Sequence, residues 1–152
     1  MGQTTLLDTN IFIYLTKGGL DEPTLLRLRS ATSSGFNLSV ISKIELLGFA
    51  FPTTLEKEQA ENFIQVSTIF MLTDDVVDKT IELRKTRKIK LPDAIIAATA
   101  IVHNLTLISR NDKDFAAIPS LRYSNPFSED WKASIAEIKI LLDDANEEYP
   151  PV

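Results

Sequence analysis

Short apolar runs and longer amphipathic segments alternate along this chain of 152 residues. Runs typical of buried strands occupy residues 4–8, 36–40, 67–72 and 106–109, and a shorter candidate lies near residues 121–123. Between these runs, apolar residues recur at the spacing of a helix. One predicted helix begins at residue 11. The others cover residues 21–30, 42–51, 55–65, 74–87 and 92–103. This order predicts one α/β domain with a mostly parallel central sheet flanked by helices.

Residues with special backbone preferences mark several of these boundaries. Gly18 and Gly19 follow the first predicted helix, and Pro23 stands in the first turn of the second, where its missing N–H costs little. Pro52 separates two further helices. Asn104 tolerates the left-handed conformation that often follows the last helical turn, and it marks the end of the helix over residues 92–103.

Four acidic residues stand at the edges of these elements, namely Asp8, Glu45, Asp93 and Asp114. Ligands of open α/β sheets bind beyond the carboxyl ends of the strands, so separate segments can deliver these acids to one edge. Each acid adjoins apolar sequence, where an ionised carboxylate is costly without a cation or hydrogen bonds. Carboxylate oxygens suit Mg²⁺ or Mn²⁺ better than zinc. The pattern therefore favours a divalent-metal site.

Each acid also has a purely structural interpretation. Asp8 suits a turn after the first strand, with Asn10 as the cap of the next helix, and Asp93 suits the first turn of a helix. Asp114 closes a stretch, residues 111–114, that resembles an ordinary polar turn. Glu45 is the most informative of the four, because its neighbours are apolar and predict a mostly interior helix. An acid in such a helix needs compensation or must face a cleft. The structural interpretation of Glu45 is a chance position at the edge of an amphipathic face.

The negative net charge of the chain comes from its last 27 residues. The formal charge is −5, but residues 1–125 carry 14 Lys/Arg and 14 Asp/Glu, whereas residues 126–152 carry 2 and 7. The main part of the chain is therefore neutral and can approach nucleic acid. A basic cluster precedes Asp93 and is a candidate for phosphate contacts with RNA. A solvated helix end explains this cluster equally well. Its members are Arg84, Lys85, Arg87, Lys88 and Lys90.

The amino-acid composition excludes several classes of protein and of metal site. The chain has no cysteine, which excludes disulfides and thiolate metal sites, and its single histidine, His103, stands late in an apolar helix. We assign His103 no catalytic role. No apolar run approaches the roughly 20 residues of a membrane span, and the N-terminus lacks the basic region of a secretory signal. We expect a soluble, cytoplasmic protein without membrane contact.

Together, the acids and their local sequences resemble the PIN-domain family. The resemblance rests on Asp-Thr-Asn at residues 8–10, the passage from Ser39 to Glu45, Leu-Pro-Asp-Ala-x-Ile-Ala-Ala at 91–98, and Ser-Arg-Asn-x-x-Asp-Phe at 109–115. It covers roughly residues 4–127 and is strongest to VapC-type toxins of bacterial toxin–antitoxin pairs.

This resemblance implies a Mg²⁺- or Mn²⁺-dependent endoribonuclease that cleaves RNA, is commonly a homodimer and is held inactive by an antitoxin. Asp8, Glu45 and Asp93 match three family acids and would act as catalytic metal ligands. Many members carry the fourth acid at the position of Asn111, whereas others carry it three residues further on, where this chain has Asp114. Asp114 would therefore be the fourth acid. Asn10, Ser109 and Asn111 would support the acids.

Two other functions agree with the same residues. In a phosphatase of the haloacid-dehalogenase kind, Asp8 would be a covalent nucleophile, but Asn10 stands where that chemistry needs a second acid as proton donor. A catalytically silent PIN-like module that only binds partners is the other alternative. Metal-dependent RNA cleavage that is abolished by Asp8→Asn separates these functions.

The sequence predicts one domain over residues 1–127. The pattern of residues 128–152 predicts a separate acidic helix and tail. After Ser128 as cap, apolar residues form a heptad-like stripe that packs on its own domain or on a partner. These residues are Trp131, Ile135, Ile138, Leu142, Ala145 and Tyr149.

Overall fold

A computed structural model describes residues 4–18 and 20–127. Its strands are β1 (Thr5–Leu7), β2 (Asn37–Ser39), β3 (Thr68–Phe70), β4 (Thr106–Ile108) and β5 (Tyr123–Ser124). Its helices are α1 (Ile11–Lys17), α2 (Glu22–Ala31), α3 (Val40–Leu47), α4 (Thr54–Val66), α5 (Asp74–Thr86), α6 (Leu91–Val102) and α7 (Asp112–Phe115). The predicted C-terminal helix over residues 128–152 lies outside the described residues.

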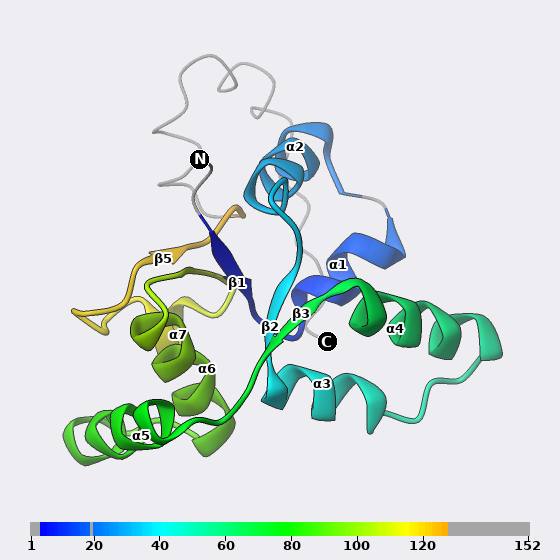
Figure 1. Ribbon diagram of the computed structural model, residues 1–152. Coiled ribbons are helices and arrows are strands. Elements are labelled where there is room, and N and C mark those ends of the chain that lie inside the picture. Colours follow the sequence, from blue (N-terminus) through cyan, green and yellow to red (C-terminus); the bar gives the residue numbers. More distant parts are fainter. Residues whose placement is uncertain (1–3, 19, 128–152) are drawn as a thin grey trace.

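The strands form two parallel ladders that lie side by side (Figure 1). One ladder has the order β1-β4-β5 and the other pairs β2 with β3, and every pairing is parallel. The Asn37 side-chain amide donates a hydrogen bond of 2.9 Å to the Thr5 carbonyl oxygen and thereby ties β2 to β1. The strand order therefore runs β3-β2-β1-β4-β5, and the chain reverses its direction of growth between β1 and β4. The prediction of a parallel α/β sheet is confirmed.

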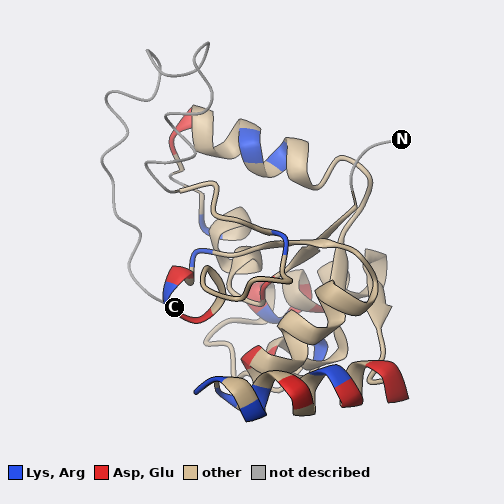
Figure 2. Ribbon diagram, turned by 90° about the vertical axis from the view of Figure 1, so that its left-hand side faces the viewer, with Lys and Arg blue, Asp and Glu red and all other residues tan. Residues whose placement is uncertain are grey.

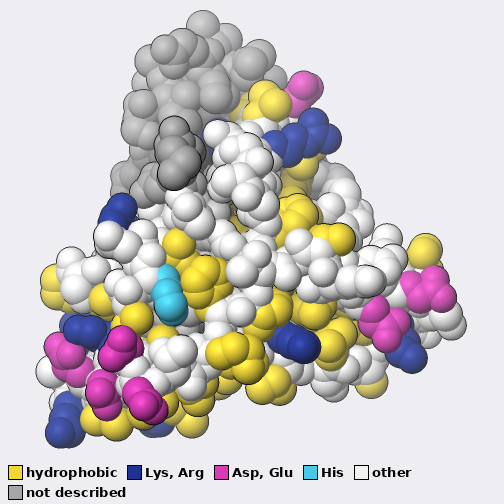
Figure 3. Space-filling model, viewed as in Figure 1, with side chains coloured by type: hydrophobic (Ala, Val, Ile, Leu, Met, Phe, Trp, Pro, Cys, Tyr) yellow, Lys and Arg dark blue, Asp and Glu magenta, His cyan; other side chains and the backbone are white. Residues whose placement is uncertain are grey.

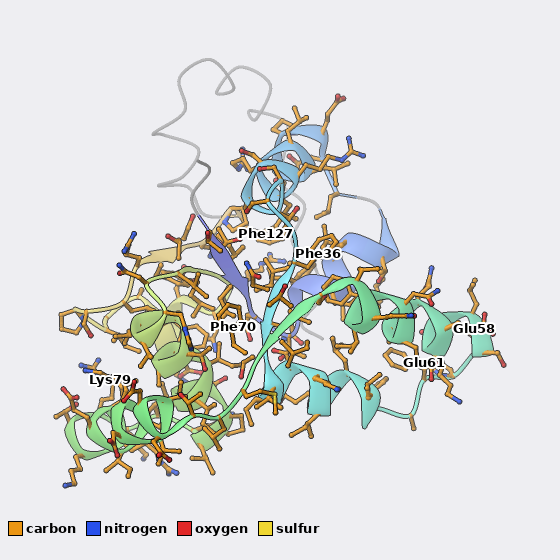
Figure 4. All side chains as sticks on the ribbon, in the orientation of Figure 1. Phe36, Glu58, Glu61, Phe70, Lys79 and Phe127 are labelled. Carbon is orange, nitrogen blue, oxygen red and sulfur yellow. The ribbon has the colours of Figure 1, made fainter. Side chains whose placement is uncertain are left out.

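Two apolar clusters fill the space between the sheet and the helices. The first gathers around α6, whose residues Ala94 to Ala100 are all buried, and includes Phe115. The second lies around α1, α3 and α4, where rings such as Phe36 and Phe127 pack against it. In Figure 1, α5 and α6 lie at the lower left and α3 and α4 at the lower right. Figure 4 shows Phe36 directed inward, whereas Lys79 and Glu58 project away.

Several sequence expectations need correction. Residues 112–115 form a short helix instead of a polar turn, because the Asn111 side chain accepts a hydrogen bond from the Asp114 backbone N–H. The last strand is two residues long and lies at 123–124 instead of 121–123. Asn104 has a φ of 61°, so the prediction of a left-handed residue beyond α6 is confirmed.

Helix α3 is not mostly interior, contrary to the sequence-based interpretation. Only Ser42 and Leu46 of this helix are buried, while Ile44 and Leu47 are 60% and 45% exposed. Figure 3 shows hydrophobic side chains at the surface over this part of the molecule. The helix lies at the edge of the fold with one narrow face on the core, and its outer face is also apolar. Runs of apolar residues therefore predicted more burial than the fold provides.

Charged side chains concentrate on the outer helices. Figure 2 shows acidic residues along the first turns of α5 and basic residues at its C-terminal end. This arrangement places each sign where the helix dipole stabilises it. No helix within the described part of the chain combines the length and the apolar character that a membrane crossing requires.

Candidate functional site

Asp8 lies directly beyond β1, at the point where the strand order reverses. Its backbone N–H continues the ladder by donating to the Ile108 carbonyl oxygen at 3.0 Å. Its carboxylate accepts hydrogen bonds of 2.8 Å from the Thr9 backbone N–H and from the Ser109 hydroxyl. Ser109 follows β4, so this second bond joins the ends of two neighbouring parallel strands. Such a point at the carboxyl edge is where open α/β sheets bind ligands.

Glu45 reaches the same edge from α3. Its Oε1 accepts a hydrogen bond of 2.6 Å from the Thr9 hydroxyl, which also lies 2.8 Å from the hydroxyl of the buried Ser42. Since the Thr9 hydroxyl donates its one proton to Glu45, Ser42 must donate to Thr9. This chain of hydroxyls holds an otherwise exposed carboxylate beside Asp8.

Asp93 and Asp114 complete the acidic group. Asp93 lies in the first turn of α6, whose apolar body is buried, as the sequence predicted. Asp114 lies on α7, where its carboxylate accepts a hydrogen bond of 2.7 Å from the Asn111 side-chain amide. Asn111 therefore caps α7 and orients Asp114 at the same time.

A pocket of about 600 Å³ collects most of these residues. Asp8, Glu45 and Asp93 all line it, whereas Asp114 does not form part of its wall. Asn10 also lines the pocket, but its side chain makes no hydrogen bond that caps α1. The remaining lining residues are Thr9, Ile11, Ile13, Tyr14, Leu46, Phe49, Phe51, Ser109, Arg110 and Asn111.

Burial and the charges of neighbouring acids disfavour the ionised forms of Asp8 and Asp93. Burial raises the pKa of Asp93 to about 6, with further contributions from Asp8, Asp114 and Glu45. Burial also raises the pKa of Asp8, against hydrogen bonds from Ser109 and Thr9 that act in the opposite direction. A cation placed among the carboxylates would relieve this excess of negative charge.

The donor set fits a hard divalent cation. It consists of carboxylate and hydroxyl oxygens, the ligands that Mg²⁺ and Mn²⁺ prefer. Within residues 4–18 and 20–127, however, no three acidic or histidine side chains already stand together as a set of metal ligands. Metal binding would therefore require side chains to rotate. The exposed Glu45 side chain would exchange its hydrogen bond from the Thr9 hydroxyl for the metal.

The raised pKa of Asp93 gives a testable dependence of stability on pH. Because the folded state binds this proton more tightly than the unfolded state, the contribution of Asp93 to stability falls as pH rises from its ordinary 3.8 through about 6. In metal-free buffer, Asp93→Asn should therefore gain stability relative to the wild type at about pH 7 and gain less at about pH 4.5. Denaturant unfolding at both pH values measures this difference.

Asp78→Asn is the control, because it removes a carboxylate from the exposed face of α5. An equal response of the Asp78 and Asp93 variants to pH would contradict the crowding of acids in the pocket.

The basic cluster lies outside the pocket wall, at the end of α5 and in the following loop. Arg84, Lys85, Lys88 and Lys90 are exposed, whereas Arg87 is half-buried and donates a hydrogen bond of 3.3 Å to the Ala117 carbonyl oxygen. Arg87 therefore has a structural contact that the sequence did not suggest.

Two contacts of pocket residues were not predicted from the sequence. The Thr9 hydroxyl donates a hydrogen bond to Glu45, which joins residues 36 positions apart. Arg110 supplies a cation to the pocket wall, and its guanidinium carbon lies 5.6 Å from the centre of the Tyr14 ring and 4.9 Å from that of Phe127. The Ser-Arg-Asn motif at 109–111 was the available signal.

Comparison with known proteins identifies the family to which this chain belongs. Residues 5–121 match the family model of the PIN domain. The chain belongs to the PIN-domain family. A search of curated proteins yields no match to this PIN domain.

Solved structures of toxin–antitoxin proteins share the fold of this PIN domain. A chain of the toxin–antitoxin complex from Klebsiella pneumoniae is 32% identical, with a TM-score of 0.64, and the match covers 81% of this chain and 98% of that chain. VapBC2 from Rickettsia felis, bound to a DNA fragment from its promoter, gives 25% identity, a TM-score of 0.67, and coverage of 81% and 98%. VapBC-1 from nontypeable Haemophilus influenzae is 24% identical, with a TM-score of 0.69, and the match covers 83% of this chain and 100% of that chain. The resemblance to the VapC-type PIN domain is confirmed.

Proposed function

We propose that this PIN domain is a divalent-metal-dependent endoribonuclease that hydrolyses RNA phosphodiester bonds, and that it is the toxin of a toxin–antitoxin pair. The observation that carries the proposal is the meeting of Asp8, Glu45 and Asp93 in one pocket, at the strand edge of a chain that belongs to a nuclease family. Family membership disfavours the phosphatase alternative.

The acids and their partners divide the work between binding and orientation. Asp8, Glu45 and Asp93 would hold Mg²⁺ or Mn²⁺, with Asp114 as a further acid beside Asp93. The bound ion would supply an activated water and neutralise charge on the leaving oxygen. Ser109 and Thr9 fix Asp8 by hydrogen bonds, and Asn111 fixes Asp114.

The test of this proposal is cleavage of a single-stranded RNA by the purified chain. Cleavage should require added Mg²⁺ or Mn²⁺, stop with a chelator and return when the metal is restored. Calorimetry without RNA provides an independent measurement, since metal binding to the acids should release protons from Asp93 at about pH 6, where this carboxyl is partly protonated. Metal binding without any cleavage would favour the silent interaction module.

The basic cluster is proposed to bind the phosphates of RNA. Because Arg87 contacts Ala117, the informative change is Lys85→Ala with Lys88→Ala, which removes two exposed cations. We expect weaker binding to RNAs of all sequences, with a salt dependence that flattens by about 0.7 log units for each lysine–phosphate interaction that the substitutions remove. Titrations at several salt concentrations measure this slope.

Lys57→Ala, on the exposed face of α4, controls for the loss of one positive charge, so the two changes are compared per lysine removed. A slope that stays unchanged in the double variant, or that falls by the same amount per lysine with Lys57→Ala, would move the RNA-binding surface elsewhere.

An antitoxin and a second copy of the chain are the proposed protein partners, in the cytoplasm. The similar structure from Klebsiella pneumoniae is a toxin–antitoxin complex, which supports the antitoxin as a partner. Exposed apolar side chains of this chain are candidate contacts for such protein partners. They include Ile44, Leu47, Met71, Leu72 and Leu91. Light scattering of the purified chain measures the oligomeric state.

A further inference from the structure

The pocket has an aromatic part that metal binding does not explain. Beside its acids it is lined by Phe49 and Phe51, which follow α3 in the chain. Phe49 is 60% exposed, an unfavourable position for a large apolar ring in a protein without a ligand. The exposed ring and the acids therefore share one cavity, and a molecule bound at the acids would meet the ring.

Local structure holds Phe49 in this position. Helix α3 ends at Gly48, whose N–H donates a hydrogen bond of 2.8 Å to the Ile44 carbonyl oxygen. A Cβ atom at residue 48 would lie 2.7 Å from this oxygen, so the tight turn requires glycine. The Phe51 ring packs against the second apolar cluster, and its centre lies 4.8 Å from the Phe49 ring in an edge-to-face arrangement. Phe51 thereby anchors the exposed ring.

We propose that Phe49 stacks on a nucleobase of the RNA strand whose phosphate lies at the acids, with Phe51 as the support of its ring. This inference rests on the proposed ribonuclease function and adds a base-binding subsite to it. A nucleotide presents its charged phosphate and its planar base on opposite sides of the sugar, which matches a pocket that combines carboxylates, Arg110 and an aromatic ring. Because every base has a π-face, the subsite provides affinity for single strands without strict sequence preference.

The distribution of exposed apolar residues favours a base over a protein segment as the occupant. Ile44 and Leu47 are also exposed on α3, but neither lines the pocket. A protein that covers α3 would use all three side chains, and an aliphatic residue would serve as well as an aromatic one. A base needs the flat ring at residue 49 alone.

Binding experiments with the full chain test the subsite without cleavage. The probe is a single-stranded RNA with 2-aminopurine as a fluorescent base, and Ca²⁺, an oxygen-binding cation larger than Mg²⁺, replaces Mg²⁺ so that binding is measured without strand scission. We expect Phe49→Ala and Phe49→Leu to weaken binding roughly 5- to 100-fold and to diminish the quenching that stacking causes. Phe49→Trp should bind at least as tightly as the wild type. The matched controls, Ile44→Ala and Leu47→Ala, should change affinity less than about twofold.

An RNA with one abasic nucleotide identifies the base as the group recognised. If Phe49 stacks on the base that this RNA lacks, Phe49→Ala should no longer weaken binding when the abasic nucleotide occupies the subsite. Retained affinity in Phe49→Leu, or equal weakening in all three alanine variants, would overturn the proposal in favour of a general apolar contact. Normal RNA binding by Phe49→Ala together with impaired association to a protein partner would assign this ring to a protein interface.

Failure of this inference is distinguishable from failure of the proposed function. A wild-type chain that cleaves RNA with Mg²⁺, while Phe49→Ala binds RNA normally, would overturn the base subsite alone. A wild-type chain that neither binds nor cleaves RNA would overturn both. Circular dichroism checks that the variants fold, which is expected because the Phe49 ring is exposed.

Discussion

Asp8→Asn should lower the rate of RNA cleavage by at least about 100-fold, because even residues that only orient a metal ligand contribute roughly 10- to 100-fold. The substitution removes a negative charge and keeps the shape of the side chain. Its oxygen can still accept from the Thr9 N–H, and its amide can donate to the Ser109 hydroxyl. The fold should therefore survive, and stability without metal should rise, since burial already disfavours the Asp8 carboxylate.

The measurement compares initial rates of cleavage at saturating Mg²⁺ with the thermal stability of the same samples. Asp78→Asn, which removes an exposed carboxylate from α5, should cleave at the wild-type rate. Cleavage by Asp8→Asn at the wild-type rate would show that the pocket is not the nuclease site.

Phe115→Ala should lower the free energy of unfolding by about 3–5 kcal/mol, the usual cost of truncating a buried aromatic side chain. Phe115 is fully buried on α7 within the first apolar cluster, and its ring centre lies 6.2 Å from that of Tyr123. Since single domains are stable by only about 5–15 kcal/mol, the variant should be close to unfolding at moderate temperature. Urea titration in metal-free buffer measures the decrease.

Phe49→Ala provides the contrast, with an expected change within about 0.5 kcal/mol because its ring is mostly exposed. A decrease below about 1 kcal/mol for Phe115→Ala would mean that α7 contributes little to the core. The position of Asp114 on this helix would then depend on the Asn111 cap instead of on packing.

The sequence predicted the elements that local pattern determines. Asp8 and Asp93 stand at a strand end and in a helix start, and both were placed correctly because the preference of a residue for such positions is local. The uniformly apolar sequence after Asp93 correctly predicted a buried helix. Membership of the PIN-domain family then followed from the order of the motifs.

Other features depend on contacts that no local pattern contains. The bond between Thr9 and Glu45 joins the first strand end to α3, and the sequence gives no sign of this pairing. The exposure of Ile44 and Leu47 was missed because an apolar side chain has the same pattern whether it faces the core or a partner. The short helix at Asp112–Phe115 was missed because the Asn111 cap is equally typical of a turn.

The seam between the two ladders has a consequence for how the molecule opens. Among the described residues, the Asn37 side chain joins β1 and β2 where backbone ladder bonds are lacking. Asp8 belongs to one side of this seam and Glu45 to the other, so the site straddles two potential units of cooperative unfolding. In hydrogen exchange, the β2–β3 amides should therefore open before those of β1 and β4. Each such opening would separate the two carboxylates while most of the core stays folded.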